Sequence, residues 1–171
     1  MALTIRPAVP ADAPQILAFI RALAVYEREP DAVLATEQDI LAHGFGSQPY
    51  FSCLIAELDG EPAGFALYFF NYSTWLGRPG LYLEDLFVPP ELRGRGIGRA
   101  LLQRVAAAAL QHGCQRLQWE VLDWNTPAID FYRAMGAEFL DEWRNVRVSG
   151  DALARLAAAP AEPAGPSGAA S

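Results

Sequence analysis

Lysine is absent from this chain of 171 residues, so all 13 of its basic residues are arginines. A Walker A phosphate loop is therefore excluded, because that loop ends in Gly-Lys-Ser or Gly-Lys-Thr. Cysteine and histidine are also scarce, with two of each. Cys53, Cys114, His43 and His112 lie too far apart to suggest a disulfide framework or a metal site, so we expect no metal and buried thiols.

Long apolar runs are missing as well, since none approaches the ~18 residues that span a bilayer. Residues 1–25 lack the pattern of a secretory signal, which favours a cytoplasmic protein. The net charge of −7 argues against bulk binding to nucleic acid or to an anionic membrane. Against that acidic background four arginines fall within 12 residues: Arg93, Arg95, Arg99 and Arg104.

A hydrophobic fraction of 52% predicts a globular protein with one main domain, over residues 1–150. We expect a short helix at 151–159 and a disordered tail rich in Pro, Ala, Gly and Ser at 160–171. Apolar spacing and turn signals predict strands at 3–6, 51–58, 63–71, 81–88, 115–122 and 143–148, and helices at 12–25, from Thr36 to just before Gly44, at 96–112 and from Asn125 to Gly136. This order is α+β: a mixed, mostly antiparallel sheet flanked by helices, with one parallel pair joined through the central helix.

The strand at 81–88 leads through Pro89 into a loop where glycines at 94, 96 and 98 alternate with arginines, and then into a helix. Glycines allow close approach to the backbone, and the first turn of a helix has free N–H groups. The helix dipole and the arginines then favour an anion, so this loop predicts phosphate binding.

Two other interpretations of the loop are weaker. A Rossmann fingerprint would need glycine where Arg99 stands, and an antiparallel hairpin upstream does not suit that fold. A glycine-rich turn with solvated arginines is the plain structural alternative.

The pattern of Arg93, Gly96 and Gly98 resembles the pyrophosphate loop of the GNAT N-acetyltransferases. The segments 81–88, 124–132 and 135–137 resemble the diamine acetyltransferase branch of this superfamily, which includes spermidine/spermine N-acetyltransferases and their thialysine-acetylating relatives. Tyr26-Glu27 fits the same branch, and the resemblance covers about residues 3–148. Near residue 73 polyamine enzymes tend to carry an aspartate before the tryptophan of this segment, whereas Tyr72-Ser73-Thr74-Trp75 here resembles the thialysine type.

The resemblance implies the acyl-CoA N-acyltransferase (GNAT) fold, acetyl-CoA as cofactor and a homodimer. It also implies that main-chain groups around the loop, and the start of the helix at Pro127, contact the cofactor. The implied cofactor-binding residues are Leu86, Phe87, Val88, Arg93, Gly94, Arg95, Gly96, Ile97, Gly98, Arg99, Asn125, Pro127 and Ala128. Without that role Leu86, Phe87 and Val88 would be core residues and Asn125 a helix cap.

Acetyl transfer to an alkyl amine needs a base, because neutralising the protonated amine at pH 7 costs about 4–5 kcal/mol. The resemblance selects Glu84 as this base or as the amine's anchor, rather than as an ion-pair partner on the sheet. Regular alternation would put Glu84 and Asp85 on opposite faces, so only one would face the site unless a bulge intervenes.

The leaving thiolate needs an acid, and the resemblance assigns this role to Tyr132, which could otherwise only pack against its neighbours. The amine's charge needs carboxylates or aromatic rings. The predicted substrate-binding residues are Tyr26, Glu27, Glu84, Trp119 and Glu120, although exposed glutamates often form only a solvated face.

The sequence thus predicts an acetyl-CoA-dependent N-acetyltransferase that acts by direct attack on a small diamine, polyamine or thialysine-like amino acid. Acetylation of a protein or peptide amine by the same machinery is one alternative. A non-catalytic acyl-CoA-binding module is the other.

Overall fold

The computed structural model describes residues 1–158, so the predicted tail at 160–171 lies outside the described part. The chain divides into two compact units, Met1–Thr126 and the residues from Pro127 onward. The first unit contains β1 (Leu3–Pro7), η1 (Pro10–Asp12), α1 (Ala13–Tyr26), α2 (Glu37–Phe45), β2 (Ser52–Leu58), β3 (Glu61–Ser73), β4 (Arg78–Phe87), η2 (Pro90–Leu92), α3 (Ile97–Gln111) and β5 (Leu117–Gln118). At its end α4 (Thr126–Ala134) begins and continues into the second unit, which also contains α5 (Gly150–Ala158).

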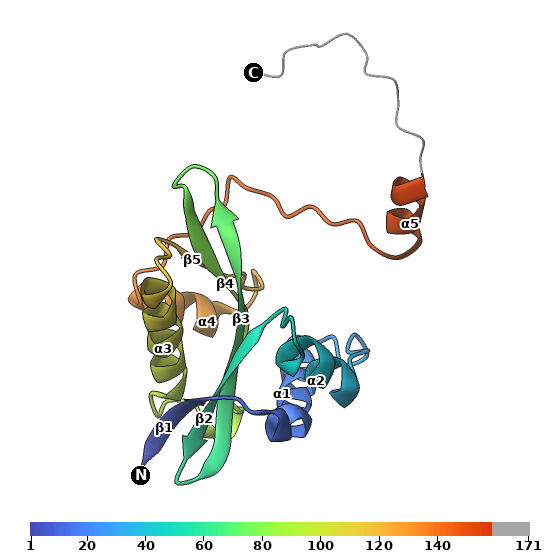
Figure 1. The fold of residues 1–171 in the computed structure, drawn as a ribbon. Helices are drawn as coiled ribbons and strands as arrows, with labels where there is room; N and C mark the ends of the chain where they lie inside the picture. The colour runs from blue at the N-terminus through green and yellow to red at the C-terminus, as the bar shows by residue number, and fades with distance from the viewer. Residues whose placement is uncertain (159–171) are drawn as a thin grey trace. The chain divides into compact units, whose positions relative to one another are not determined.

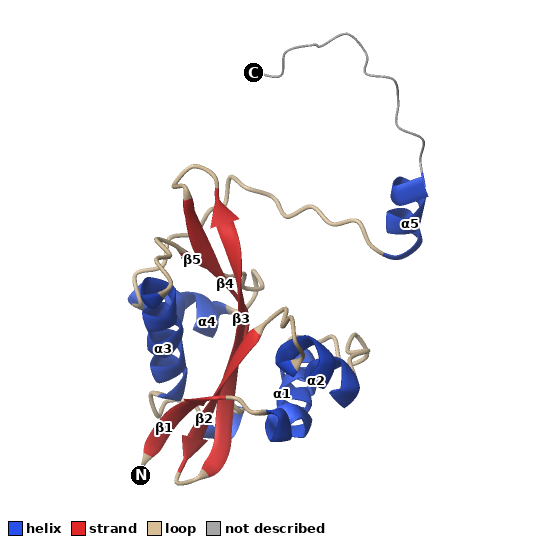
Figure 2. Cartoon of the chain, viewed as in Figure 1, coloured by secondary structure: helices blue, strands red, loops and turns tan. Residues whose placement is uncertain are grey.

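One sheet organises the first unit, with its five strands in the order β1-β2-β3-β4-β5 (Figures 1 and 2). The first three pairings are antiparallel, and β4 and β5 are parallel. The predicted α+β class, with a mostly antiparallel sheet and one parallel pair, is confirmed.

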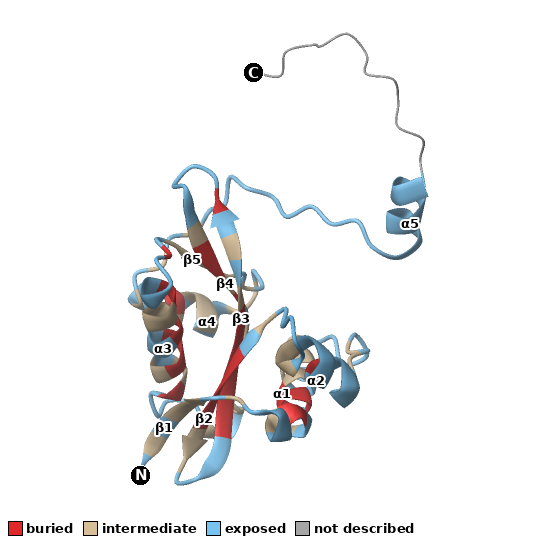
Figure 3. Ribbon diagram, in the orientation of Figure 1, coloured by how far each residue is buried: buried red, intermediate tan, exposed pale blue. Residues whose placement is uncertain are grey.

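Helices cover both faces of this sheet, with α3 on one side and α1 and α2 on the other (Figure 1). On the α1 side Phe19 stacks on Phe65 of β3, with ring centres 5.5 Å apart. The α3 side is closed by Leu101 and Val105, which are fully buried. Figure 3 shows buried residues on α3 as well as on the strands that it covers. Because both faces of β3 and β4 are covered, the apolar run at 63–69 is buried almost throughout.

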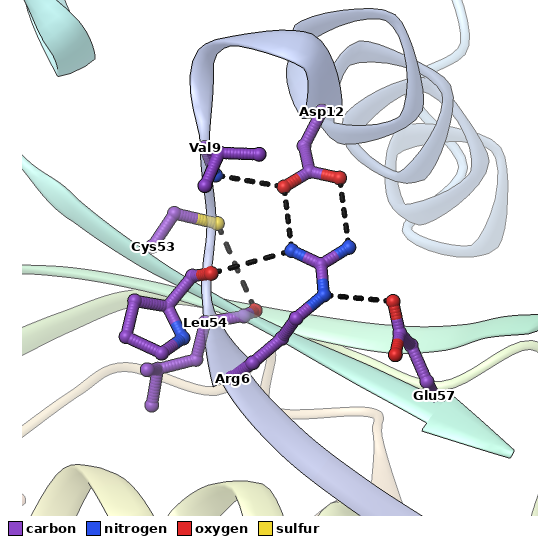
Figure 4. A network of polar contacts seen from close by, with 7 residues as sticks. Arg6, Val9, Asp12, Cys53, Leu54 and Glu57 are labelled. Atoms are coloured by element: carbon purple, nitrogen blue, oxygen red, sulfur yellow. Dashed lines mark hydrogen bonds and ion pairs between the residues drawn. The ribbon is translucent and has the colours of Figure 1, made fainter. Parts of the chain in front are cut away.

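A polar network fixes the start of α1 against the sheet (Figure 4). Arg6 of β1 donates two hydrogen bonds to the Asp12 carboxylate, at 2.7 and 2.9 Å, and a third to Glu57 of β2 at 2.7 Å. These bonds lower the pKa of Asp12 and keep it ionised. The network sets where α1 begins, and with it where the other end of α1, at Tyr26, comes to lie.

The capping box predicted at Thr36 is confirmed, since Thr36 Oγ1 accepts from the Asp39 N–H at 3.2 Å and Asp39 accepts from the Thr36 N–H at 2.8 Å.

Three of the predicted elements differ clearly from the structure. Helix α2 passes through Gly44 and ends at Phe45. The strand predicted at 115–122 is only Leu117–Gln118, because the chain leaves β4 after two paired residues. Residues 143–148 form no strand and are exposed.

No helix among residues 1–158 is long and apolar enough to cross a membrane.

Candidate active site

Strand β4 loses its neighbour half-way along. It pairs with β5 only at Leu81 and Tyr82, opposite Leu117 and Gln118. From Leu83 to Phe87 its other edge pairs with no strand in the described part of the chain. Main-chain N–H and C=O groups on this edge are therefore available to a ligand. Pro89 then ends the strand, as the sequence predicted.

The loop after β4 presents a row of free backbone donors. Gly94 and Gly96 have φ angles of 77° and 81°, left-handed values that glycine adopts without strain. Six consecutive N–H groups, at residues 94–99, donate no hydrogen bond within residues 1–158. Ile97 is 1% exposed and anchors the start of α3, whose first turn contributes three of these donors. Such a nest at a helix N-terminus is suited to bind phosphate oxygens.

The arginines around this loop differ in what they contact. Arg95 and Arg99 are exposed, so their charges are available to an anion. Arg93 instead donates from Nε to the Val88 carbonyl at 2.9 Å, and its guanidinium lies 4.3 Å from the centre of the Tyr26 ring. Its backbone N–H donates to Pro90 at 3.3 Å. Arg93 thus joins the loop to the end of α1.

A β-bulge lies where the two adjacent carboxylates occur. Leu83 pairs with Tyr68 and Asp85 with Leu67, so Glu84 is an extra residue in β4. Leu83 lies on the α3 side of the sheet together with its partner Tyr68. Side chains alternate between the two faces along a strand, so Glu84, the next residue, lies on the α1 side. Asp85 shares the α1 side with its partner Leu67. The bulge therefore places both carboxylates on one face, where regular alternation would have separated them.

Four carboxylates gather on that face, and we call them the acidic cluster: Glu27, Glu84, Asp85 and Glu120. Burial, together with the charges of Glu84 and Glu27, raises the pKa of Asp85 to about 7. Burial also raises the pKa of Glu27. Burial, a hydrogen bond with Glu120 and the charge of Glu84 raise the pKa of the Tyr82 phenol. The cluster therefore makes this face strongly attractive to a cation.

Tyr26 connects the regions around the cluster. Its hydroxyl donates to Asn125 Oδ1 at 3.1 Å, and its ring centre lies 6.2 Å from that of Trp124. On Trp124 in turn lies the Arg28 guanidinium, 3.8 Å from the ring centre. The end of α1 therefore contacts both Arg93, at the start of the glycine-rich loop, and residues 124–125.

The remaining predicted substrate residues are less closely tied to the cluster. Trp119 is half-buried directly after β5. Ser73 lies in the segment where the sequence predicted a difference between the two subgroups. It is buried and accepts from the Leu76 N–H at 3.2 Å in the turn before β4. It contributes no charge there, which keeps the hairpin tip free of the carboxylate expected of a polyamine enzyme.

Tyr132 belongs to the second unit and is buried on α4. This helix begins at Thr126 with Pro127 and Ala128 in its first turn, as predicted. It ends where Gly136 takes a φ of 89° and the Ala137 N–H donates to the Tyr132 carbonyl at 3.0 Å. The predicted end of this helix at Gly136 is confirmed. The bond from the Ala137 N–H places Tyr132 in the last turns of the helix.

Sequence reasoning gave no role to three residues that the structure brings to this region: Asp85, Arg28 and Trp124. Asp85 had a visible signal, since two adjacent acids inside an apolar strand are unusual. Arg28 had none, because its contact depends on a left-handed backbone at the end of α1, with φ of 65°.

Comparison with known proteins decides the family. The model of the acetyltransferase (GNAT) family matches residues 15–137. The chain belongs to this family. Its members use acetyl-CoA as acyl donor, and this protein is accordingly an N-acetyltransferase.

Curated relatives and solved structures agree with this assignment. Thialysine N-epsilon-acetyltransferase of Bos taurus is 46% identical over 90% of this chain and 96% of its own length. L-ornithine N5-acetyltransferase of Arabidopsis thaliana is 32% identical over 87% and 85%. An integron cassette protein from the mobile metagenome of V. cholerae shares the fold, with a TM-score of 0.78 and 28% identity over 93% of this chain and 99% of that one.

Proposed function

We propose that this enzyme transfers an acetyl group from acetyl-CoA to the primary amine of a small cationic substrate, and that a thialysine-like amino acid is its preferred acceptor. One observation carries the proposal: a single strand, β4, bears two members of the acidic cluster and leads directly into the row of free amides. A site for a cation therefore adjoins a site for a diphosphate along one strand.

The residues present fit coenzyme A. The N–H groups of residues 94–99 would hold its diphosphate, supported by Arg95 and Arg99, and the unpaired edge of β4 at Leu86–Val88 would run beside its extended arm. Asn125, Pro127 and Ala128 complete the proposed contacts on the resemblance of their motif. Acetyl-CoA supplies an acetyl thioester, the group that an amine can attack.

Glu84 and Tyr132 are the side chains proposed for the chemistry. Glu84 is exposed on the α1 side of the bulge, where it can take a proton from the amine or anchor its charge. Tyr132 would give a proton to the departing thiolate, because a phenol can act as a general acid toward a thiolate held within hydrogen-bond reach. Attack is direct in this scheme, and no acyl-enzyme is needed.

The class of amine follows from charge and from the relatives. The acidic cluster favours a protonated amine, and the aromatic residues Tyr26 and Trp119 directly precede its members Glu27 and Glu120 in the sequence. Ser73 adds no carboxylate for the second charge of a polyamine. The bovine relative is named for thialysine, and the Arabidopsis relative for ornithine, which is also a small amino acid with a side-chain amine.

One assay tests the proposal: thiol release from acetyl-CoA with thialysine, ornithine, putrescine, spermidine and a lysine peptide. We expect thialysine to give the highest kcat/KM, with ornithine next. A higher value for spermidine would contradict the subgroup assignment, and a higher value for the peptide would contradict a small substrate. Binding of acetyl-CoA without thiol release on any amine would instead indicate a non-catalytic module.

We also propose a cytoplasmic homodimer. The dimer rests on the family resemblance, and it is supported by three exposed apolar residues at the tip of the β3–β4 hairpin, Tyr72, Trp75 and Leu76, of which Trp75 is 88% exposed. Sedimentation equilibrium of the full chain should give twice the chain mass of 18.6 kDa. A single 18.6 kDa species at micromolar concentration would contradict the dimer.

A further inference from the structure

Asp85 is the member of the acidic cluster that sequence reasoning left unused. We infer that Asp85 accepts the proton that the bound amine must lose, and that its neighbour Glu84 holds the amine's positive charge. This inference deepens the proposed function and rests on it. It assigns separate roles to two adjacent carboxylates, which the bulge in β4 has brought to one face of the sheet.

The position of Asp85 differs from that of Glu84 in burial. Its cross-strand partner Leu67 is 8% exposed, and Cys53, the next residue in the same row across the sheet, is 7% exposed. Asp85 is itself only partly exposed, whereas Glu84, the extra residue of the bulge, is exposed. Glu84 can therefore meet a cation arriving from solvent, while Asp85 lies at the border of the apolar core.

No positive charge among the described residues compensates the negative charge of Asp85. Within residues 1–158 its carboxylate forms no ion pair and no side-chain hydrogen bond. The titratable groups that face it are Glu84 on β4, Glu27 at the end of α1 and the Cys53 thiol on β2. A carboxylate in such a place gains stability either from a cation or from a proton. An ammonium substrate offers both.

A metal ion is a poor alternative occupant. No group of three or more His, Cys, Asp or Glu side chains in the described part of the chain is arranged to hold one. An alkyl ammonium needs no such convergence, because Glu84 can accept one of its N–H donors while a second N–H faces Asp85.

The proton balance of the step is simple. One N–H bond of the ammonium R–NH3⁺ breaks, the proton forms an O–H bond with the Asp85 carboxylate, and the electron pair stays on nitrogen for attack. After attack the nitrogen still carries two protons, and one of these N–H bonds breaks as the amide forms. This second proton restores the phenol of Tyr132, whose own proton has gone to the departing thiolate, while Asp85 returns the first proton to solvent. Its pKa of about 7 suits this cycle, because a base of ordinary pKa near 4 would hold the proton about a thousandfold more weakly.

The first test needs no substrate. In the free protein labelled with ¹³C at aspartate carboxyl groups, the Asp85 resonance should titrate with a midpoint near pH 7. Glu84→Gln and Glu27→Gln should each lower that midpoint, because each removes a negative charge that faces Asp85. Glu61→Gln, an exposed change at the start of β3, is the matched control and should leave it unchanged. A midpoint near pH 4 overturns the inference. So does a midpoint that is the same in wild type, Glu84→Gln and Glu27→Gln.

The second test is the pH profile of kcat/KM for thialysine. Wild type should rise tenfold per pH unit below about 7 and then level off, because Asp85 must be ionised to accept the proton. Asp85→Asn should lose about 100-fold at pH 7.5. Its kcat/KM should also keep rising between pH 7 and 9, since the variant depends on amine that is already neutral. In Glu84→Gln the profile of kcat/KM should still level off, but at a lower pH than in wild type.

The outcomes separate this inference from the proposed function. Wild type that releases no thiol with any amine removes the proposed function, while the ¹³C titration still reports on Asp85. Active wild type with a parallel profile in Asp85→Asn removes the inference alone. Acetyl-CoA affinity equal to wild type will show that Asp85→Asn is folded, and if that variant does not fold, the pH at which the Glu84→Gln profile levels off decides the question.

Discussion

The glycine-rich loop, which follows β4 and η2, and the acidic cluster, two of whose members lie on β4, are built in different ways. The loop at residues 94–99 is local: six consecutive backbone donors set by two glycines and one helix start. The acidic cluster is assembled from the end of α1, the bulge in β4 and the residue pair after β5. In the proposed site the loop would bind an anion mainly through its main chain, and the cluster would bind a cation through its side chains. A local main-chain site can be recognised in a sequence, whereas a side-chain site of distant origin needs the fold.

The largest effect is expected from straining the loop. Gly96→Val places a β-branched residue at a φ of 81°, where it is strongly disfavoured, so the donors should diverge. We expect acetyl-CoA to bind at least about 100-fold more weakly by calorimetry. Gly60→Val is a matched control, since Gly60 has a φ of 87° and equally open surroundings in the β2–β3 turn. Equal loss of affinity in both variants would mean that strain alone, and not the loop, is responsible.

Tyr132→Phe removes one hydroxyl and leaves the ring. If Tyr132 gives the thiolate its proton, kcat should fall about 100-fold while the acetyl-CoA dissociation constant stays within twofold. Steady-state kinetics and calorimetry together check this. Unchanged turnover would leave Tyr132 with a packing role, in keeping with its burial and its contact with Phe131.

Glu84→Gln tests whether the two regions act independently. Loss of its charge should raise KM for the amine and lower kcat/KM about 30-fold at neutral pH, because one charge-assisted hydrogen bond is lost. The affinity for acetyl-CoA should not change. An equal weakening of both ligands would show that the cluster and the loop are a single site and would break the comparison.

Asp85→Asn should change stability in a pH-dependent way. Folding raises the pKa of Asp85 from 3.8 to about 7, so the folded protein holds the proton more tightly than the unfolded chain does. This contribution to stability is present below pH 4 and is lost as the pH rises to about 7. The free energy of unfolding of the variant, relative to that of wild type, should therefore rise across that range. We expect a rise of about 1–2 kcal/mol after allowance for partial exposure. Denaturant unfolding at pH 4.5 and pH 8 measures it, and a constant difference would contradict the raised pKa.

The smallest effect concerns the contact between the two regions. Arg93→Gln removes the guanidinium from the Tyr26 ring, a contact of about 0.5–1 kcal/mol, and with it the hydrogen bond from Arg93 Nε to the Val88 carbonyl. We expect KM for the amine to rise about threefold with little change in acetyl-CoA affinity. Arg95→Gln is the counterpart, because Arg95 is exposed on the loop, and it should weaken acetyl-CoA and spare the amine. The reverse pattern would place Arg93 on the phosphates.

The sequence predicted the loop and most of the fold because these depend on neighbours. Pro89, Gly94, Gly96 and the helix after them act on the backbone within a few residues. The same holds for the capping box at Thr36 and the stop at Gly136. The short β5 was missed because the apolar pattern of 115–122 does not show where its partner strand departs.

The acidic cluster could be predicted only in part, because it depends on register. Strict alternation separates Glu84 from Asp85, and no sequence signal marks the extra residue that brings them together. The contact of Arg93 with Tyr26 joins residues 67 positions apart and likewise has no local signal. The side-chain site therefore emerged from the sheet register and the end of α1, and the main-chain site from the sequence.

The most direct test of the account follows the backbone amides. In ¹H–¹⁵N spectra of the full chain, saturating coenzyme A should shift the six amide signals of residues 94–99 strongly, while the amide of Gly60 stays in place. Subsequent addition of thialysine should shift the signals of Glu27, Glu84 and Asp85 and leave the loop nearly unchanged. Loop amides that do not respond to coenzyme A would contradict the account.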